Sequence, residues 1–435
     1  MLGLRAAMAS FGDQTPAQAF GIRALFCGQT MPLSLDWIKR LARWAVAVGA
    51  VFYFNDLVQD VRGGMTDGLG HAIGDDFINF WSGPFLAWHH RATEIYNFMT
   101  FHTFEQSVVG QSLQDYRYSY PPTLLVLMAP FALVPYLPGL AIWLISGWYA
   151  FYRALRLAMP KGGALLLAAA TPAAFLNTIG GQTGTWTAAL FGAGLGLLDR
   201  QPIIAGSCLG LFVNKPQLGL LIPLALVAGQ RWRALASAAI TAAALTTTAA
   251  FFFGVDIYSD YLQQLTQLRH MLLEGVVVDP WGRMISVFVV VRRLGADVPQ
   301  AYAVQALFAA VAALAVGVAW YRGASFGIRN AALVLGTCMA TPYLQDYDLV
   351  FGALVVAWLW HDADVRAQIP ESSLFFASAG LLLLPMLSLF STWLDKVIGV
   401  HVGTLLAMLS FVPLFVIAAK CTLAPPRAVA LLPAE

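Results

Sequence analysis

Two adjacent carboxylates, Asp75 and Asp76, lie at the start of residues 74–122, the stretch of sequence richest in side chains that could take part in catalysis. That stretch also holds many aromatic residues, two adjacent histidines and two arginines. A loop this long in a compact protein is usually functional. A carboxylate held there can act as a general base, which takes the proton of an attacking hydroxyl group. The competing interpretation is two solvated acids, one of which caps the helix expected from Phe77.

Charged residues inside apolar stretches form a second group of candidates. Lys215 lies in a long apolar segment, where a charge is costly and usually functional, and its ammonium group would suit a phosphate. The alternative is a lysine whose long stem reaches the membrane surface. Asp346 and Asp348 form an acid pair in a similar setting, which could bind a metal, relay protons, or pair with Lys215 or an arginine.

Three cations, Arg269, His270 and Arg283, belong to a second polar stretch. They could hold a phosphate at the membrane surface, and the alternative is interfacial charge attracted to anionic lipid. Gln182 lies at a helix break, where it could hydrogen-bond a sugar hydroxyl, although a helix-capping turn is the simpler role. Tyr120 precedes two prolines that fix the start of a helix, so its first role is architectural.

The composition is that of an integral membrane protein. The chain has 435 residues, of which 59% are hydrophobic and only 11% charged, whereas a soluble domain carries about a quarter charged residues. The four cysteines lie far apart and predict neither a disulfide framework nor a metal site. The sequence lacks the phosphate-binding GK[ST] loop and the HExxH motif, which argues against ATP-driven transport and zinc proteolysis. We expect no signal peptide, because no basic start leads into a compact apolar run.

The apolar segments predict an all-α polytopic bundle of roughly 11–13 transmembrane segments. Basic residues at the start of the first span, Trp37–Asp56, place that end inside, so the loop 59–120 faces the periplasm of a bacterium. Within it we expect two short amphipathic helices along the membrane face, Phe77–His90 and Thr100–Gln111. By parity, a second loop, 256–281, lies on the same side and carries another amphipathic run.

Several segments are too short to span, and we expect them to be broken or re-entrant. Pro202–Val213 and Leu218–Ala228 flank a break at Lys215, since proline and an adjacent charge interrupt a helix where a cavity accepts them. A similar pair is broken at Asp346 and Asp348. Pro121–Leu137 and Gly139–Leu157 form an apolar pair whose flanking charges conflict with two full spans, so one of them is expected to be short. The domains are then a tail (1–36), one bundle (37–420) and a tail (421–435).

Five motifs in this order resemble glycosyltransferase family 87. They are DFxxFW from Asp76, the YPP run Tyr120–Pro130, GGQTG at 180–184, AGSCLGLFVNKPQ at 205–217, and TPYLQDYDL at 341–349. The resemblance covers roughly residues 70–360. It implies a C-type glycosyltransferase fold and a polyprenyl-phosphate sugar donor, with mannose as the default sugar. It also implies a first-loop aspartate as the base, which falls on Asp76, with Asp75 as the alternative.

The sequence therefore predicts a glycosyltransferase of the bacterial inner membrane that acts on the periplasmic side and inverts the anomeric carbon. Its partners would be a polyprenyl-phosphate-linked sugar, a lipid or glycan acceptor and membrane lipids, with no nucleic acid. We expect no cofactor, although a divalent ion near the late acid pair stays open. The remaining candidates divide into phosphate-binding residues (Lys215, Arg269, His270, Arg283) and substrate-binding residues (Trp81, Tyr120, Gln182, Trp281, Asp346, Asp348). The alternatives are a transporter or flippase of a lipid-linked sugar, to which broken helices also point, and a polysaccharide ligase or polymerase.

Overall fold

The computed structural model describes residues 64–275 apart from Gly68, 283–388 and 402–423, together with parts of the segment 40–58 and residue 397. Contacts divide the chain into two units, Met1–Val48 and Gly49–Glu435, and all elements below belong to the second. The predicted tail 1–36, most of the predicted tail 421–435, and Trp281 lie outside the described residues. The predicted span Trp37–Asp56 is described only in part.

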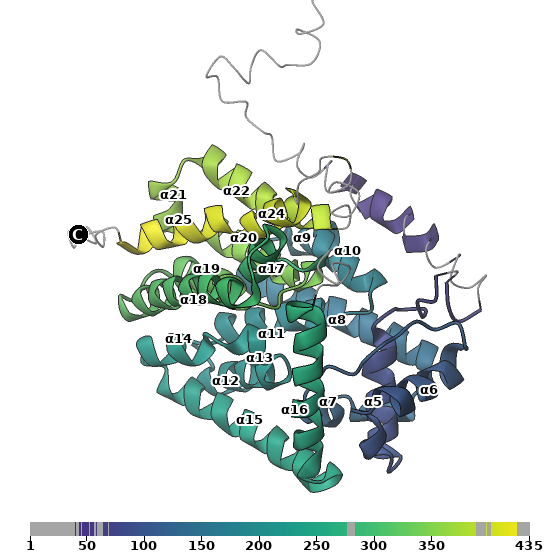
Figure 1. Cartoon of the computed structure of the whole chain (residues 1–435). Coiled ribbons are helices and arrows are strands. Elements are labelled where there is room, and N and C mark those ends of the chain that lie inside the picture. Colours follow the sequence, from purple (N-terminus) through teal and green to yellow (C-terminus); the bar gives the residue numbers. More distant parts are fainter. Residues whose placement is uncertain are drawn as a thin grey trace, which may run out of the picture. The chain divides into compact units, whose positions relative to one another are not determined.

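The described part of the chain is all-α, as predicted, and contains two isolated β-bridges but no strand (Figure 1). Its α-helices are α5 (Phe77–Trp88), α6 (Phe98–Val109), α7 (Pro122–Leu127), α8 (Tyr136–Ala158), α9 (Ala164–Ala170), α10 (Pro172–Ile179), α11 (Gly184–Gly196), α12 (Pro202–Gly210), α13 (Pro216–Gly219), α14 (Ile222–Ala228), α15 (Trp232–Phe253), α16 (Asp256–Arg269), α17 (Val287–Arg293), α18 (Val298–Tyr321), α19 (Phe326–Ala340), α20 (Gly352–His361), α21 (Ala363–Gln368), α22 (Glu371–Leu383), α24 (Val402–Leu409) and α25 (Val412–Leu423). Short 3-10 or π turns join several of them: η1 (Ala92–Glu94), η2 (Ala129–Leu133), η3 (Leu211–Asn214), η4 (His270–Glu274), η6 (Asp346–Phe351) and η7 (Leu384–Ser388).

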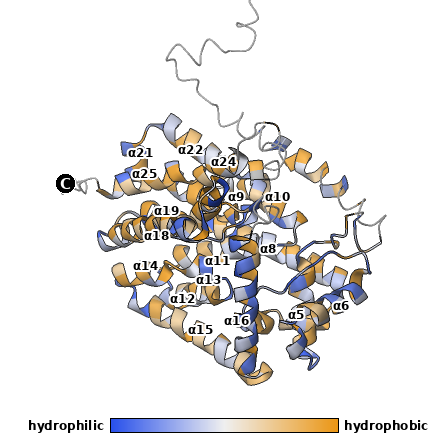
Figure 2. Ribbon diagram, in the orientation of Figure 1, coloured by the Kyte–Doolittle hydropathy of each residue, from blue (hydrophilic) through white to orange (hydrophobic). Residues whose placement is uncertain are grey.

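Three helical stretches of the described residues are long and apolar enough to cross a membrane: Trp232–Phe253, Val298–Tyr321 and Gly403–Leu423. The first two correspond to α15 and α18, each an unbroken helix of more than 20 residues. Figure 2 shows the contrast with α16, which is largely hydrophilic beside the apolar α15. These helices are consistent with a membrane protein, and the total number of spans stays a prediction.

The broken helices appear where the sequence predicts them. α12 ends at Gly210 and a 3-10 turn runs to Asn214, after which α13 begins at Pro216, so Lys215 lies at the break. Proline has no backbone N–H and cannot continue the preceding hydrogen-bond ladder, which explains the position of this break. In the predicted apolar pair, the first segment is short, because it divides into α7 and η2. A further break at Thr171 divides residues 164–179 into α9 and α10.

The two predicted loop helices are present as α5 and α6. α5 is not the predicted amphipathic surface helix, however, because ten of its twelve residues are buried. Its Phe80 ring stacks on Trp143 of α8, with ring centroids 5.5 Å apart, and Trp81 stacks on Phe104 of α6. The first loop is therefore a packed subdomain with its own aromatic core, and that core fixes the direction of the turn before α5.

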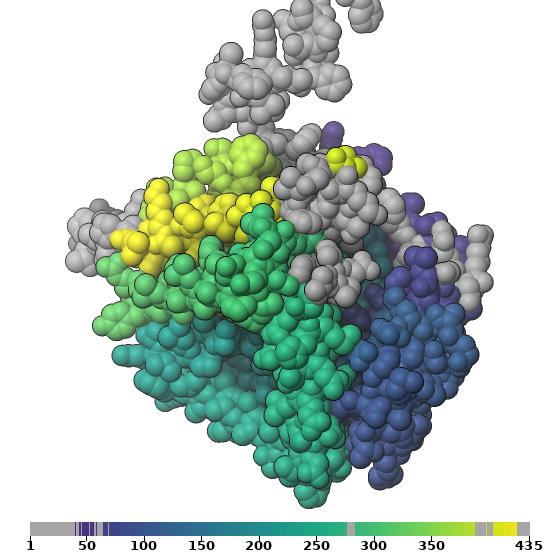
Figure 3. Space-filling view, viewed as in Figure 1, coloured from purple at the N-terminus to yellow at the C-terminus, as the bar shows by residue number. Residues whose placement is uncertain are grey.

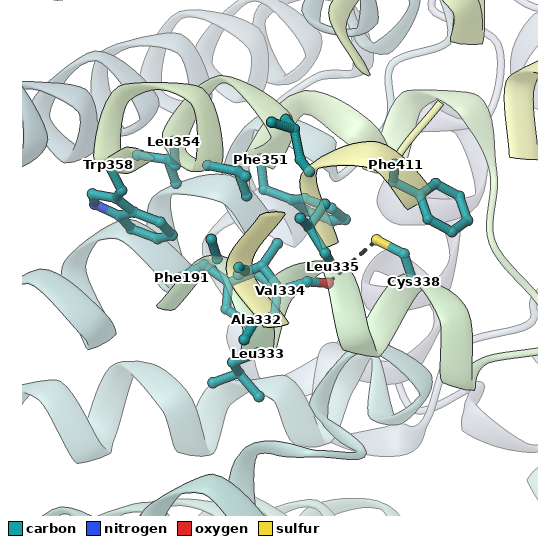
Figure 4. Close-up of a cluster of buried hydrophobic side chains, with 14 of the residues drawn as sticks. Phe191, Ala332, Leu333, Val334, Leu335, Cys338, Phe351, Leu354, Trp358 and Phe411 are labelled. Atoms are coloured by element: carbon teal, nitrogen blue, oxygen red, sulfur yellow. Dashed lines mark hydrogen bonds between the residues drawn. The ribbon is translucent and has the colours of Figure 1, made fainter. Parts of the chain in front are cut away.

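α19 carries the center of the main apolar core, as all of its residues from Ala331 to Ala340 are buried. Leu335 and its neighbors pack with Phe351, Leu354 and Phe411, as Figure 4 shows. Close packing of this kind tolerates little movement. The polar turn that follows α19, which leads to η6, is therefore held firmly at the end of a buried helix.

Candidate active site

A cavity of about 460 Å³ lies where the first loop, the end of α16 and the turn before η6 meet. Its wall is formed by His71, Asp75, Asp76, Asn79, the segment from Gln114 to Arg117, Ser119, Tyr120, Leu268, Met271, Leu272, Arg283, Met284, Tyr343, Gln345 and Tyr347. In the space-filling view of Figure 3 the surface is also hollowed beside α16, but this hollow lies over the teal helices, which contribute no residue to the wall of the cavity. The cavity brings together the predicted base, one predicted cation and one predicted aromatic residue, although they are far apart in the sequence.

The acid pair lies on a strained turn directly before α5. Gly74 and Asp75 have positive φ angles of 80° and 44°, a region that non-glycine residues seldom occupy outside functional or turn positions. Asp76 occupies the N-cap position of α5, but its side chain makes no capping hydrogen bond. The alternative role of a simple helix cap is therefore wrong for Asp76, and its carboxylate is directed elsewhere.

Each carboxylate has its own hydrogen-bond donors. The Tyr116 hydroxyl donates to Asp75. The side-chain amide of Gln182 donates to Asp76, and Asn79, three residues later, donates at 3.4 Å. Burial and the neighboring charge of Asp75 raise the pKa of Asp76 to about 7, and burial also raises the pKa of Asp75. A carboxylate with its pKa near neutrality is suited to general-base chemistry.

The GGQTG motif provides the donor to Asp76. Gly181 has a φ of +55°, and a Cβ atom there would lie only 2.1 Å from the carbonyl oxygen of Gly74. The indole of Trp143 donates to the Gly181 carbonyl at 3.0 Å. Only glycine permits this close approach of two backbones. The glycine turn therefore lies directly against the turn that carries the acid pair, which places Gln182 within reach of Asp76.

Asp346 and Asp348 form ion pairs, which was one of the options left open. Arg283 binds Asp346 through two nitrogens, at 3.0 and 3.1 Å, and Lys215 binds Asp348 and the Thr183 hydroxyl. The Tyr347 ring lies close to both cations, with its centroid 5.0 Å from the Lys215 ammonium and 5.8 Å from the Arg283 guanidinium. Both aspartates are fully buried. Arg283 keeps 36% of its side chain exposed and lines the cavity, whereas Lys215 is buried behind it.

Three other candidates, Trp81, Arg269 and His270, lie away from the cavity wall. The Trp81 indole donates to the Val134 carbonyl at 2.8 Å and belongs to the aromatic core. Arg269 and His270 both bind Glu274, at 3.1 and 2.5 Å. Tyr120 lines the cavity, and its carbonyl accepts a hydrogen bond from the Tyr96 hydroxyl. In the described residues no group of three or more His, Cys, Asp or Glu is placed to hold a metal ion.

Among the cavity residues that have no predicted role in the sequence analysis, three interact with the acid pair: Asn79, Tyr116 and His71. Asn79 could have been found, because residues three apart on a helix lie on the same face, and it follows Asp76 by three positions. Tyr116 is 41 residues from Asp75, and no local pattern connects them. His71 precedes the acid pair by only four positions and pairs with Asp67 at 2.7 Å.

The sequence model of glycosyltransferase family 87 matches residues 118–342, more than half of the chain. The chain belongs to glycosyltransferase family 87. This confirms the predicted resemblance, and membership of the family indicates a glycosyltransferase. No curated protein and no solved structure matches the chain. The family match includes Tyr120, Gln182, Lys215 and Arg283, but it begins after the acid pair 75–76 and ends before the late acid pair 346–348. The roles of both acid pairs therefore rest on the geometry described above.

Proposed function

We propose that this glycosyltransferase moves a sugar, mannose by default, from a polyprenyl-phosphate donor to a hydroxyl of a lipid or glycan acceptor. The reaction takes place at the periplasmic face of the bacterial inner membrane and inverts the anomeric carbon. The observation that carries the proposal is a half-buried carboxylate with a pKa near 7, Asp76, in the same cavity as the guanidinium of Arg283.

Asp76 acts as the general base. Its two amide donors, Gln182 and Asn79, orient the carboxylate without supplying a competing charge. In the reaction the acceptor O–H bond breaks, its proton moves to the Asp76 carboxylate, and the oxygen attacks the anomeric carbon from the side opposite the phosphate. A base of this kind contributes roughly 10²–10⁴-fold to the rate.

Arg283 stabilizes the departing phosphate. A phosphate leaves as a stable anion, so a fixed cation is sufficient and a general acid is not required. Asp346 binds two of the guanidinium nitrogens, Nε and Nη2, and holds the group in a fixed orientation toward the cavity. Lys215 supports this arrangement through its ion pair with Asp348, because it does not itself line the cavity.

The first test is sugar transfer by the purified protein in lipid, with polyprenyl-phosphate-mannose and a lipid extract of the host. We expect transfer by the wild-type protein, a fall of about 10²–10⁴-fold in Asp76→Asn, and a smaller fall in Asp75→Asn. Asp256→Asn, an exposed acid at the start of α16, is the matched control.

Undiminished transfer in both acid-pair variants would exclude this mechanism. A wild-type protein that moves a lipid-linked sugar across vesicles without transferring it would favor the transporter. Retention of the anomeric configuration in the product would contradict a single displacement with one base.

A further inference from the structure

His71, on the wall of the cavity that holds the acid pair, forms a dyad with Asp67. The Nδ1 atom of His71 lies 2.7 Å from the Asp67 carboxylate. The other carboxylate oxygen of Asp67 accepts hydrogen bonds from the backbone N–H groups of Leu69 and His71, at 2.8 and 2.7 Å. Three bonds thus hold one carboxylate and fix the imidazole relative to the loop.

The protonation of the dyad follows from the partners of Asp67. Burial works against its ionization, but the hydrogen bonds from His71 hold the pKa of Asp67 below its ordinary value. An ionized carboxylate only accepts hydrogen bonds, so Nδ1 of His71 is the donor. In the neutral imidazole, Nε2 is then the nitrogen with a free lone pair, and it is the one able to take up a proton.

The loop that carries the dyad is tied firmly to its surroundings. Thr66 and Ala72 form a β-bridge across it, and the Gly70 carbonyl accepts the N–H of Gln114 at 3.0 Å. The backbone N–H of Asp75 donates to the Ala72 carbonyl at 2.7 Å, so the loop leads directly into the acid pair. The position of His71 relative to Asp75 is therefore set by backbone hydrogen bonds.

His71 belongs both to the wall of the cavity that holds the acid pair and to the solvent-exposed surface. It lines the same cavity as Asp75 and Asp76, acts electrostatically on Asp75, and keeps 40% of its side chain exposed. The charged groups around this part of the cavity are Asp67 on its own loop, Asp75 and Asp76 on the following turn, Asp115 and Arg117 on the segment before α7, and Arg283 opposite. An imidazole with a free ring nitrogen can act as a proton shuttle.

We infer that His71 is the group through which the proton of the acceptor leaves the acid pair. This inference rests on the transfer reaction proposed above. In each turnover the acceptor proton moves first to the carboxylate pair; Nε2 of His71 then accepts it and releases it to water at the cavity mouth. The electrons of the broken sugar–phosphate bond leave with the phosphate, so one proton per turnover balances the step. Asp67 is the positioning residue that directs Nε2 toward this path.

The test compares the wild-type protein, His71→Ala, His71→Gln and Asp67→Asn in the transfer assay, with and without added imidazole. We expect kcat of His71→Ala to fall roughly 10- to 100-fold with little change in KM, and free imidazole to restore much of it. His71→Gln keeps a hydrogen bond toward Asp67 but cannot carry a proton, so it should be equally slow. Asp67→Asn should lose part of the rate. The matched control is His89→Ala, an exposed histidine at the end of α5.

Each outcome bears on a different claim. A His71→Gln protein with the wild-type kcat would overturn the inference, as would a folded His71→Ala protein whose lost rate imidazole does not restore. Transfer by the wild-type protein would still stand in both cases. Absence of transfer by the wild-type protein would overturn the proposed function, and the role of His71 with it.

Discussion

Glu105 provides a test of the reasoning about buried charge that is independent of catalysis. It lies on α6 with its side chain fully buried, and neither carboxylate oxygen has a hydrogen-bond partner. Burial, together with the charge of Asp76, raises the pKa of Glu105 from 4.5 to about 9. The folded protein thus holds this carboxyl protonated at neutral pH, whereas the unfolded chain releases the proton.

The sign and size of the effect follow from proton linkage. The unfolded chain gains free energy by ionizing Glu105 at any pH above 4.5, while the folded protein does not ionize it until about pH 9. Stability is therefore lost progressively as pH rises through this window, by less than about 1 kcal/mol at pH 5 and by about 3 kcal/mol at pH 7. Glu105→Gln cannot ionize, so it should recover about 3 kcal/mol at pH 7 and less than about 1 kcal/mol at pH 5.

The assay is the free energy of unfolding in mixed detergent micelles at pH 5, 7 and 8.5, for the wild-type protein and for two variants. Glu94→Gln is the matched control, because Glu94 forms an exposed pair with Arg91 and such pairs contribute about 1 kcal/mol or less. A difference between Glu105→Gln and wild type that does not change with pH would refute the reasoning, since it would show that Glu105 ionizes normally in the folded protein.

Two further predictions concern the site. The transfer rate of the wild-type protein should fall as pH drops through about 7, because protonation of Asp76 removes the base; a rate that stays constant from pH 8 to pH 5 would exclude Asp76 from that role. Lys215→Met should lose about 3–5 kcal/mol of stability, because it leaves Asp348 as a buried charge without its cation. Adding Asp348→Asn should recover most of that loss, because the buried charge is removed while the side-chain oxygen that accepts the Gln345 N–H is retained. A double variant no more stable than Lys215→Met would show that Lys215 does not stabilize the protein through this ion pair.

The sequence by itself determined the class of the protein and the position of its irregular segments. An apolar composition with few charges leaves few alternatives to membrane helices. The breaks at Lys215 and at residues 346–348 follow from proline and from charges that an unbroken apolar helix cannot bury. The family motifs indicated the glycosyltransferase, and the family match over residues 118–342 confirmed the family. These are local properties, so they can be read along the chain.

The tertiary structure decided which residues share the cavity. Gln182 reaches Asp76 only because Gly181 allows two turns to touch, and Tyr116 reaches Asp75 across 41 residues. The packing of the folded chain also buries Trp81, whose indole bonds to a backbone carbonyl. It places Arg269 and His270 in ion pairs with Glu274. Side chains of one type look equivalent in a sequence. Their roles differ because burial and the partners supplied by distant segments set their charge and direction, and those are properties of the folded chain alone.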